Sequence, residues 1–555
     1  MKSEFPQGEI QGADIKDSMK SLIALFAGEI SGHGLESFCG GSSSFERSLL
    51  WAKMVPEAAK ITIFVRESPK TGSEIPESAL SAGGGRIPVS LCREGEWTAA
   101  SFFSRLSLES EGFDQVFIAW ADCPFLDAAL TAELYKKHLR YAAEYTFADG
   151  YPYGFSPDIL ARGIVPIIAN ISKDTTGPVT RNLVFETIKK DINSFDIETD
   201  IAPTDLRQLR LTLCCDTRRN SLVCASLEGI NARNYGEIVQ SRAGALRSLP
   251  AFYAIQVAGK CPFECVYCPY PAFCRSGKGS SSGVNATERT DEMPEEDFTR
   301  IIEKIASFSG DAVVSLSLWG ECSYHRSIVS LIRIVLSHPN LSVLIETTGI
   351  GWKNEDIEAI ALLQETASRT ANGTKKISWI VSLDAIGSAC YGEVHGIAET
   401  GSGNPRSETF LREALAFTEK LTGVFPLAVW PQMVRMNDNE TELESFYRFW
   451  KQKYGQVIIQ KHDHFCRSIE DRRVADLSPL VRNPCWHLKR DMSILIDGTV
   501  PLCREDIYAS RSYGNAVRDE ISLIWAGEQS IYEQQCGCNY EGMCGACDEF
   551  YTYNF

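Results

Sequence analysis

Three cysteines lie within eight residues, at Cys261, Cys265 and Cys268, and this spacing suits them to hold an iron–sulfur cluster. Three thiolates leave one iron of a four-iron cubane without a protein ligand. An open iron can bind a substrate or a cofactor, whereas a fully ligated cluster only transfers electrons. A zinc site or a set of buried structural cysteines is the alternative for the same residues.

Six further cysteines lie between residues 485 and 547. The first two, Cys485 and Cys503, flank an Asp-Gly pair that predicts the turn of a β-hairpin with strands at 493–496 and 499–503. Cysteines on a hairpin can converge with a later Cys-x-x-Cys pair on one centre of four thiolates. A small domain with little apolar core would need such a metal centre to stabilise its fold. Spacing alone does not choose between iron and zinc for this centre.

The elements that must position the first three cysteines alternate regularly between residues 251 and 465. Strands are predicted at 251–258, 312–319, 341–346, 377–383, 426–433 and 456–461, and helices at 295–308, 328–336, 357–363, 409–421 and 442–450. This order predicts parallel strands with right-handed crossovers, in an open doubly wound sheet or a partial barrel. Ligands gather at the carboxyl ends of the strands in both folds, and Cys261 directly follows the first strand.

A separate α/β domain is expected before this region, with strands at 61–65 and 115–120 and a helix at 130–141. The second of these strands leads into Asp122, at the place where a nucleotide-binding α/β domain holds a divalent cation. The expected domains are 20–245, 250–465 and 475–555, which agrees with a chain of 555 residues at about 150 residues per domain.

The chain is acidic, with 55 Lys and Arg against 72 Asp and Glu, a net charge of −17 and a pI near 5.1. This balance disfavours phosphate backbones and anionic lipids, so neither a nucleic acid nor a membrane is an expected partner. We find no run of eighteen apolar residues and no secretion signal, so a cytoplasmic protein is expected. In a reducing compartment, clustered cysteines indicate metal ligands before disulfides.

The first cysteine cluster resembles the signature of the radical S-adenosylmethionine superfamily, in which an aromatic residue, here Tyr267, precedes the third cysteine. The resemblance implies a 4Fe-4S cluster on the three cysteines, with S-adenosylmethionine bound at the open iron and Tyr267 near the adenine. Gly320 and Glu321, at the end of the second predicted strand, resemble the superfamily's Gly-Gly-Glu-Pro motif, whose backbone receives the methionyl ammonium. Trp319 and Cys322 depart from that motif.

Two later strand ends complete this resemblance. Ser382 and Asp384 end the fourth predicted strand, where related enzymes often read Ser-Leu-Asp-Gly. These two side chains could contact the cofactor's methionyl or ribose groups, or could cap the strand and the following loop. Residues 430–437 and 460–462 end the fifth and sixth strands and could line the pocket, or could be ordinary polar strand ends.

The C-terminal part is similar to the SPASM and twitch domains that follow the catalytic domain in radical enzymes that modify peptides, proteins or carbohydrates. The Gly-x4-Cys element, Gly514-Asn515 and the helix-like stretch 521–525 carry this similarity. The longer SPASM pattern is not met, so one auxiliary cluster is expected rather than two. Its expected ligands are Cys485, Cys503, Cys544 and Cys547, with Cys536 or Cys538 as the substitute for a wrong choice.

The N-terminal domain resembles sugar cytidylyltransferases of the nucleotidyltransferase-like fold. Residues 114–127, Asp149 with its neighbours, and residues 209–217 carry this resemblance. The Gly-rich turn that would bind phosphate, residues 26–34, has no basic residue, and a triphosphate would meet Glu29 with no cation opposite. Asp122 and Asp149 are therefore read as a vestigial nucleotide or metal site in a degenerate binding or docking domain, with retained nucleotidyl transfer as the alternative.

The order of these three parts looks like the spiro-SPASM family, which is known from spirochaetes. The resemblance implies a mixed α/β fold with a nucleotidyltransferase-like domain, a partial (β/α)6 radical barrel and a SPASM-like domain. It also implies an electron donor such as flavodoxin or ferredoxin and an unidentified peptide, protein or sugar substrate. A nucleotidyltransferase acting on a sugar and a non-catalytic iron–sulfur scaffold are the alternative functions.

Overall fold

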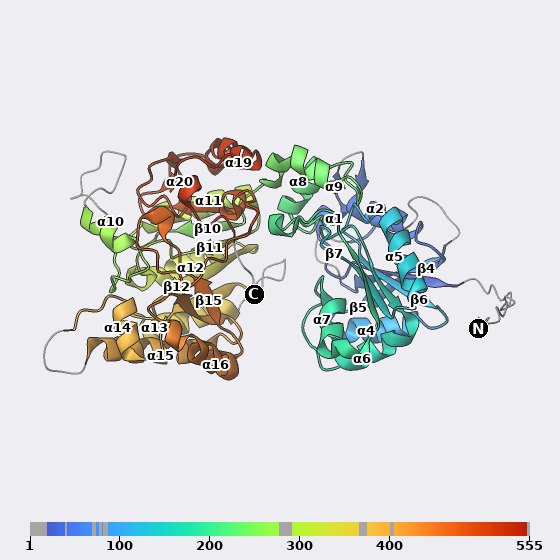
Figure 1. Ribbon diagram of the computed structural model, residues 1–555, viewed down its shortest axis with the longest axis horizontal. Coiled ribbons are helices and arrows are strands. Elements are labelled where there is room, and N and C mark those ends of the chain that lie inside the picture. Colours follow the sequence, from blue (N-terminus) through green and yellow to red (C-terminus); the bar gives the residue numbers. More distant parts are fainter. Residues whose placement is uncertain are drawn as a thin grey trace, which may run out of the picture. The chain divides into compact units, whose positions relative to one another are not determined.

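The computed structural model describes residues 19–38, 41–68, 74–76, 80, 87–276, 291–365, 375–399 and 405–551. The chain divides into two compact units, each with one seven-stranded sheet (Figure 1). Unit 1 comprises Met1–Asp216 and Leu227–Ile238, and unit 2 comprises Thr217–Ser226 and Val239–Phe555. In the described part of the chain, no helix is long and apolar enough to cross a membrane.

The sheet of unit 1 has the strand order β5-β4-β1-β6-β8-β7-β9. Its strands are β1 (Ser21–Phe26), β4 (Ala58–Arg66), β5 (Val89–Glu94), β6 (Gln115–Trp120), β7 (Tyr145–Asp149), β8 (Asp158–Ala161) and β9 (Ile197–Ile201). β8 runs antiparallel to both neighbours, and the other pairs are parallel. The strands predicted at 61–65 and 115–120 are confirmed as β4 and β6.

Helices cover both faces of this sheet. Val116 and Ile118 of β6 belong to the buried cluster that also contains residues of α4 (Ala99–Glu109), α6 (Val165–Ser172) and α7 (Leu183–Ile188), three helices that lie together in Figure 1. Because side chains alternate along a strand, Phe117 points to the opposite face. There its ring lies 5.4 Å from that of Tyr135 in α5 (Ala128–Arg140). The predicted helix at 130–141 is thus confirmed.

The sheet of unit 2 is parallel throughout, with the order β15-β14-β13-β12-β11-β10-β16. Its first six strands follow chain order and are β10 (Phe252–Ile255), β11 (Ala312–Ser315), β12 (Leu341–Thr347), β13 (Ile377–Ser382), β14 (Val429–Arg435) and β15 (Ile458–Lys461). All six predicted strands are confirmed, and with their crossover helices they form the predicted partial (β/α)6 barrel.

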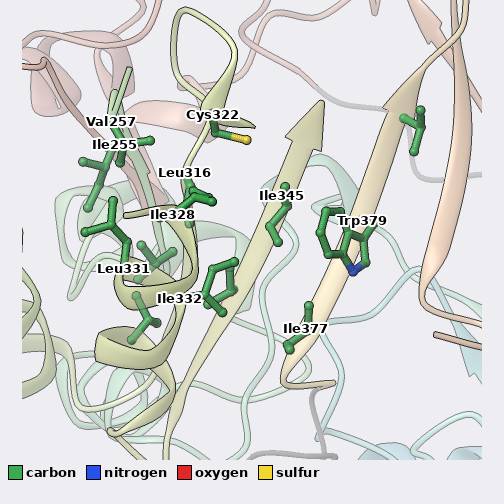
Figure 2. Packing of buried hydrophobic residues seen from close by; sticks show 14 of the residues in the cluster. Ile255, Val257, Leu316, Cys322, Ile328, Leu331, Ile332, Ile345, Ile377 and Trp379 are labelled. Atoms are coloured by element: carbon green, nitrogen blue, oxygen red, sulfur yellow. The ribbon is translucent and has the colours of Figure 1, made fainter. Parts of the chain in front are cut away.

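The crossover helices supply the apolar layer that holds these strands. They are α11 (Glu295–Ser309), α12 (Ile328–Leu336), α13 (Asn354–Glu365), α14 (Ser388–Val394), α15 (Arg406–Val424) and α16 (Leu443–Tyr454). Figure 2 shows Leu331 and Ile332 of α12, Ile345 of β12 and Trp379 of β13, which all belong to one buried cluster. Buried side chains recur three or four residues apart on α12 and two residues apart on β12, which is the pattern that buries one face of each; they are Ile328, Leu331, Ile332 and Val335 on the helix and Leu341, Val343 and Ile345 on the strand.

The predicted hairpin between 493–496 and 499–503 is wrong in its pairing. The turn is present, since Leu495 donates its N–H to Thr499 and Gly498 has a φ of +83°. The segment before it, however, is β16 (Asp491–Ile494), which pairs in parallel with β10. β16 covers the edge of the barrel sheet and satisfies backbone groups there. β17 (Thr499–Pro501) pairs instead with β18 (Ser512–Asn515).

Short helices complete the C-terminal region of unit 2. They are α17 (Trp486–Arg490), α18 (Ile521–Gly527), α19 (Gln529–Cys536) and α20 (Met543–Ala546). The helix predicted at 521–525 is confirmed as α18. A small apolar cluster that includes Leu488, Leu502, Tyr532 and Phe550 packs beside the cysteines of this region.

Candidate active site

A cavity of about 340 Å³ lies at the carboxyl ends of the unit 2 strands, and all three cysteines of the first cluster line it. The other strand ends contribute neighbouring lining residues, so the parallel topology gathers them at one place. From β11 to β15 these residues are Gly320 and Glu321, Glu346 to Thr348, Ser382, Gln432 and Val434, and Gln460 and Lys461. The expectation that residues 430–437 and 460–462 supply pocket-lining side chains is confirmed for four of them.

The cysteine loop is tied to the end of α14. Val266 donates its N–H to the carbonyl of Val394 at 2.9 Å, and Glu264 donates to that of His395 at 3.2 Å. The Cys265 sulfur lies 3.2 Å from His395 Nδ1. Gly396 has a φ of +62°, and a Cβ there would lie 2.2 Å from the carbonyl oxygen of Glu264. Glycine at this position therefore allows the loop to approach the helix closely.

The donor set of this cavity fits an iron–sulfur cluster. Burial raises the pKa of Cys268 to about 11 and the pKa of Cys265 well above its usual value. These thiols hold their protons at neutral pH, and a metal that binds them must displace those protons. Three thiols on one cavity wall, with the rest of the cavity open to a second ligand, match the arrangement expected from the spacing.

Gly320 and Glu321 form a backbone turn that touches the cysteine loop. Glu321 donates its N–H to the carbonyl of Lys260 at 2.7 Å. Gly320 has a φ of +76°, and a Cβ would lie 2.2 Å from the carbonyl oxygen of Ala258. Any other residue at Gly320 would push the two loops apart.

The last residue of β12 and the residue after it donate hydrogen bonds to the carboxylate of Glu321. It accepts hydrogen bonds of 2.7 Å from the Thr347 hydroxyl, the Thr348 N–H and the Thr348 hydroxyl. Burial raises the pKa of this carboxyl, and the three donors oppose that change. Glu321 thus fixes the backbone of the turn, and its side chain is occupied by the protein.

A hydrogen bond to Asp384 holds the Tyr267 ring in position. Its hydroxyl donates to Asp384 Oδ2 at 2.9 Å, and the Val434 N–H donates to Asp384 Oδ1 at 2.6 Å. Asp384 is fully buried with a φ of +58°, and burial raises its pKa to about 7. Ser382 lines the cavity, whereas Asp384 contacts Tyr267, Val434 and, at 3.5 Å, His395.

A second cavity is lined by five cysteines. Four are the expected auxiliary ligands, and the fifth, which the spacing did not indicate, lies just after β15. The five are Cys466, Cys485, Cys503, Cys544 and Cys547. Cys466 precedes the C-terminal cysteines by many residues, so only its place at the carboxyl end of a barrel strand could have pointed to it.

The two suggested substitutes lie elsewhere. Cys536 lines a separate surface pocket with Gly244 and Glu533, and Cys538 is exposed. Burial raises the pKa of Cys485 to about 12, so the second cavity, like the first, holds thiols that release protons on binding metal.

The two cavities share a wall. His487, Cys503 and Arg504 line both of them. The Arg504 guanidinium donates to Asp463 at 3.1 Å and to Glu505 at 3.0 Å, so its charge is compensated inside this wall. One expected ligand of the second centre therefore borders the cavity that contains the first three cysteines.

In unit 1, the position beside Asp122 that a divalent cation would take holds the guanidinium of Arg181. Arg181 donates to both oxygens of buried Asp122, at 3.0 and 2.7 Å, and to Asp216 at 3.1 Å. Asp122, Cys123 and Cys214 are close enough to share a metal ion, yet the carboxylate of this group already has its positive partner. Asp149 is half-exposed and faces Arg207 at 3.9 Å.

Comparisons with known proteins give relatives and partial structural matches. No protein-family model matches the chain. A Treponema pallidum (strain Nichols) protein named "Uncharacterized protein" is 43% identical over 376 residues, which are 67% of this chain and 99% of the relative. Another T. pallidum protein with the same name is 43% identical over 72 residues, 13% of this chain and 32% of that relative.

Three solved structures illustrate the structural matches. Streptococcus suis SuiB bound to precursor peptide SuiA is 13% identical, with 70% of this chain and 84% of SuiB covered and a TM-score of 0.39. BtrN in complex with AdoMet and 2-DOIA is 16% identical, with 52% and 87% covered and a TM-score of 0.31. A cytidylyltransferase from Leptospira borgpetersenii is 13% identical, with 41% and 95% covered and a TM-score of 0.34.

Proposed function

The chain belongs to the same family as the T. pallidum protein that is 43% identical to it over 376 residues, and we propose that it is a radical S-adenosylmethionine enzyme. One observation carries this proposal: Cys261, Cys265 and Cys268 line one cavity at the carboxyl ends of a parallel (β/α)6 sheet, beside the Gly320 turn. A purely structural metal site would have no use for an open cavity of this size next to its ligands.

In this proposal the three thiolates hold a 4Fe-4S cluster and the cavity holds S-adenosylmethionine. When bound and reduced, the cluster would supply the electron that cleaves S-adenosylmethionine to methionine and a 5′-deoxyadenosyl radical, which abstracts hydrogen from the substrate. Gly320 presents backbone to the methionyl ammonium, and Tyr267 packs near the adenine, held by Asp384. Ser382 is available to the methionyl or ribose groups.

The second cavity would hold one auxiliary cluster on Cys485, Cys503, Cys544 and Cys547. This role is supported by Cys503 and Arg504, because both residues line the second cavity and also the cavity that contains the first three cysteines. An auxiliary cluster there could accept an electron from the substrate or help to bind it. Zinc is the alternative for this centre, since four thiolates suit both metals.

The remaining parts of the proposal concern partners and arrangement. A flavodoxin or ferredoxin would deliver the electron in a cytoplasmic setting, and the substrate would be a peptide, a protein or a carbohydrate. We propose the spiro-SPASM arrangement, with residues 20–245 as a degenerate nucleotidyltransferase-like domain, 250–465 as the radical domain and 475–555 as the SPASM-like domain. The Arg181–Asp122 pair supports degeneracy, because a divalent cation would have to displace a bidentate guanidinium.

The direct test is the reductive cleavage of S-adenosylmethionine. We expect the anaerobically reconstituted chain to form 5′-deoxyadenosine with dithionite. The Cys268→Ala variant should form none, because two cysteines cannot hold a four-iron cubane with a single open iron. Cys274→Ala is the matched control, since Cys274 is exposed and lies outside the cavity lining, and its product should match that of the unmodified chain. Product at the unmodified rate from Cys268→Ala would overturn the assignment.

The same preparation separates the two alternative functions. A sugar nucleotidyltransferase would release pyrophosphate from CTP and a sugar phosphate even without the three cysteines. A non-catalytic scaffold would bind iron and sulfide and yield no 5′-deoxyadenosine with any reductant.

A further inference from the structure

We propose that Cys466 is a metal ligand in reserve at the second cysteine centre, able to replace Cys547. The inference rests on the proposed metal at that centre and is independent of radical chemistry at the first. It concerns a residue that neither the cysteine spacing nor the family resemblance indicates.

Cys466 lies close to the expected ligands of the second centre. Cys466 lines the same cavity as the four expected ligands, and its thiol lies near enough to that of Cys547 to interact with it. The turn that carries Cys466 also packs against α20, the helix that carries Cys544. A sulfur in contact with a ligand sulfur can reach the same metal with little movement of the chain.

The second cavity contains more cysteines than one metal centre needs. A tetrahedral zinc site and a four-iron cubane each take four cysteine ligands, so one of the five thiols is surplus. The Cys547 sulfur accepts the backbone N–H of Glu549 at 3.2 Å, a contact that orients this sulfur within the cavity. Cys466 comes from the turn after β15 rather than from the C-terminal segment that carries the other four, and we therefore assign it the exchangeable place in the set.

The turn that carries Cys466 is held in place by hydrogen bonds within the same loop. Phe465, Cys466 and Arg467 all have left-handed φ values of 47°, 52° and 69°, and side chains of the same loop lock them. Asp463 accepts the N–H of Phe465 at 2.7 Å, and His464 Nδ1 accepts that of Arg467 at 3.2 Å. Because Phe465 lines the first cavity while Cys466 lines the second, this short turn connects the reserve ligand directly to the wall between them.

The exchange is a ligand substitution without oxidation or reduction. The Cys466 sulfur forms a bond to the metal and loses its proton, while the bond from the metal to the Cys547 sulfur breaks and that sulfur takes up a proton. Because the two thiols line the same cavity close to each other, the proton released by one can be taken up by the other.

The test measures metal at the second centre alone. In a full-length background with Cys261, Cys265 and Cys268 changed to Ala, we would reconstitute the parent, Cys466→Ser, Cys547→Ser and the Cys466→Ser/Cys547→Ser double variant. Iron, sulfide and zinc per chain and the visible absorption spectrum are the readouts. Cys536→Ser is the matched control, because Cys536 lines a different pocket.

We expect both single variants and the control to keep the metal content of the parent, and the double variant to lose it. Cys547→Ser should also change the absorption or Mössbauer spectrum, because one ligand has moved to another position on the chain. Gel filtration and thermal unfolding of each protein before reconstitution would show whether the double variant is folded. Cys485→Ser provides a second comparison, since a centre with a reserve only for Cys547 should lose metal when Cys485 is removed.

Three results would overturn the proposal. Cys547→Ser could lose as much metal as the double variant, in which case Cys466 is no substitute. The double variant could keep its metal, in which case neither residue is needed. The parent could bind no metal, in which case the centre itself is absent, whatever the deoxyadenosine assay gives for the first cluster.

Discussion

At the residue scale, the main finding is that two acidic side chains near the proposed cofactor act on the protein rather than on a ligand. Glu321 accepts three hydrogen bonds from Thr347 and Thr348, and Asp384 accepts one from Tyr267 and one from Val434. Both carboxyls are buried, so each needs these donors. We infer that their role is to hold the Gly320 turn and the Tyr267 ring in position.

Replacing Tyr267 with Phe tests this role. The ring packing is kept, but a buried acceptor of Asp384 loses its donor, which costs about 1–3 kcal/mol of the free energy of unfolding. Urea unfolding of the metal-free chain, followed by tryptophan fluorescence, measures the change. Tyr324→Phe serves as the control, because Tyr324 is exposed. Equal free energies of unfolding for Tyr267→Phe and the unmodified chain would show that the hydrogen bond from Tyr267 to Asp384 does not stabilise the fold.

At the scale of elements, one buried ion pair connects the segment before the barrel with the C-terminal helices. The Arg247 side chain is 0% exposed and that of Glu528 is 2% exposed, with 2.6 Å between nitrogen and oxygen. Arg247 also donates to the carbonyls of Leu488 and Trp525 and lies 3.3 Å above the Trp525 ring centroid. Burial lowers the pKa of Arg247 to about 10 and raises that of Glu528 to about 8, so desolvation opposes both charges.

Breaking this pair on one side should be costly. In Arg247→Met, Glu528 stays buried without a cation, and we expect a loss of about 3–5 kcal/mol in the free energy of unfolding. The Arg247→Met/Glu528→Leu double variant should recover part of that loss, because it buries no charge. Chemical denaturation of the three proteins at pH 7 measures both effects. A double variant less stable than the single one would contradict the explanation from desolvation.

At the scale of the whole molecule, unit 2 brings two cysteine-lined cavities together across one wall. The wall exists because β16 joins the barrel sheet at β10, which places the region after it beside the strand ends. The two-centre arrangement therefore depends on a strand from the C-terminal region completing the sheet of the preceding region.

The metal content of the full chain tests this arrangement. We expect about eight irons per chain after anaerobic reconstitution, four for each of two cubanes. Changing Cys261, Cys265 and Cys268 together should remove half of the iron and leave the rest at the second centre. Four irons with one zinc would keep the radical centre and make the C-terminal site structural. Iron below four per chain in the unmodified protein would contradict both centres.

The local parts of this protein follow from the sequence alone. Hydrophobic periodicity predicts all six barrel strands, because it reflects which face of each element is buried. The spacing of Cys261, Cys265 and Cys268 predicts a shared cavity, because residues this close along the chain need only one loop to converge.

Only the tertiary structure decided the contacts between distant segments. Cys466 joins cysteines that follow it by tens of residues, β16 pairs with β10 rather than with β17, and Arg181 reaches Asp122 from a distant turn of the chain. Such contacts leave no local pattern, because periodicity and spacing describe neighbours along the chain, whereas the packing of whole elements determines which distant side chains meet.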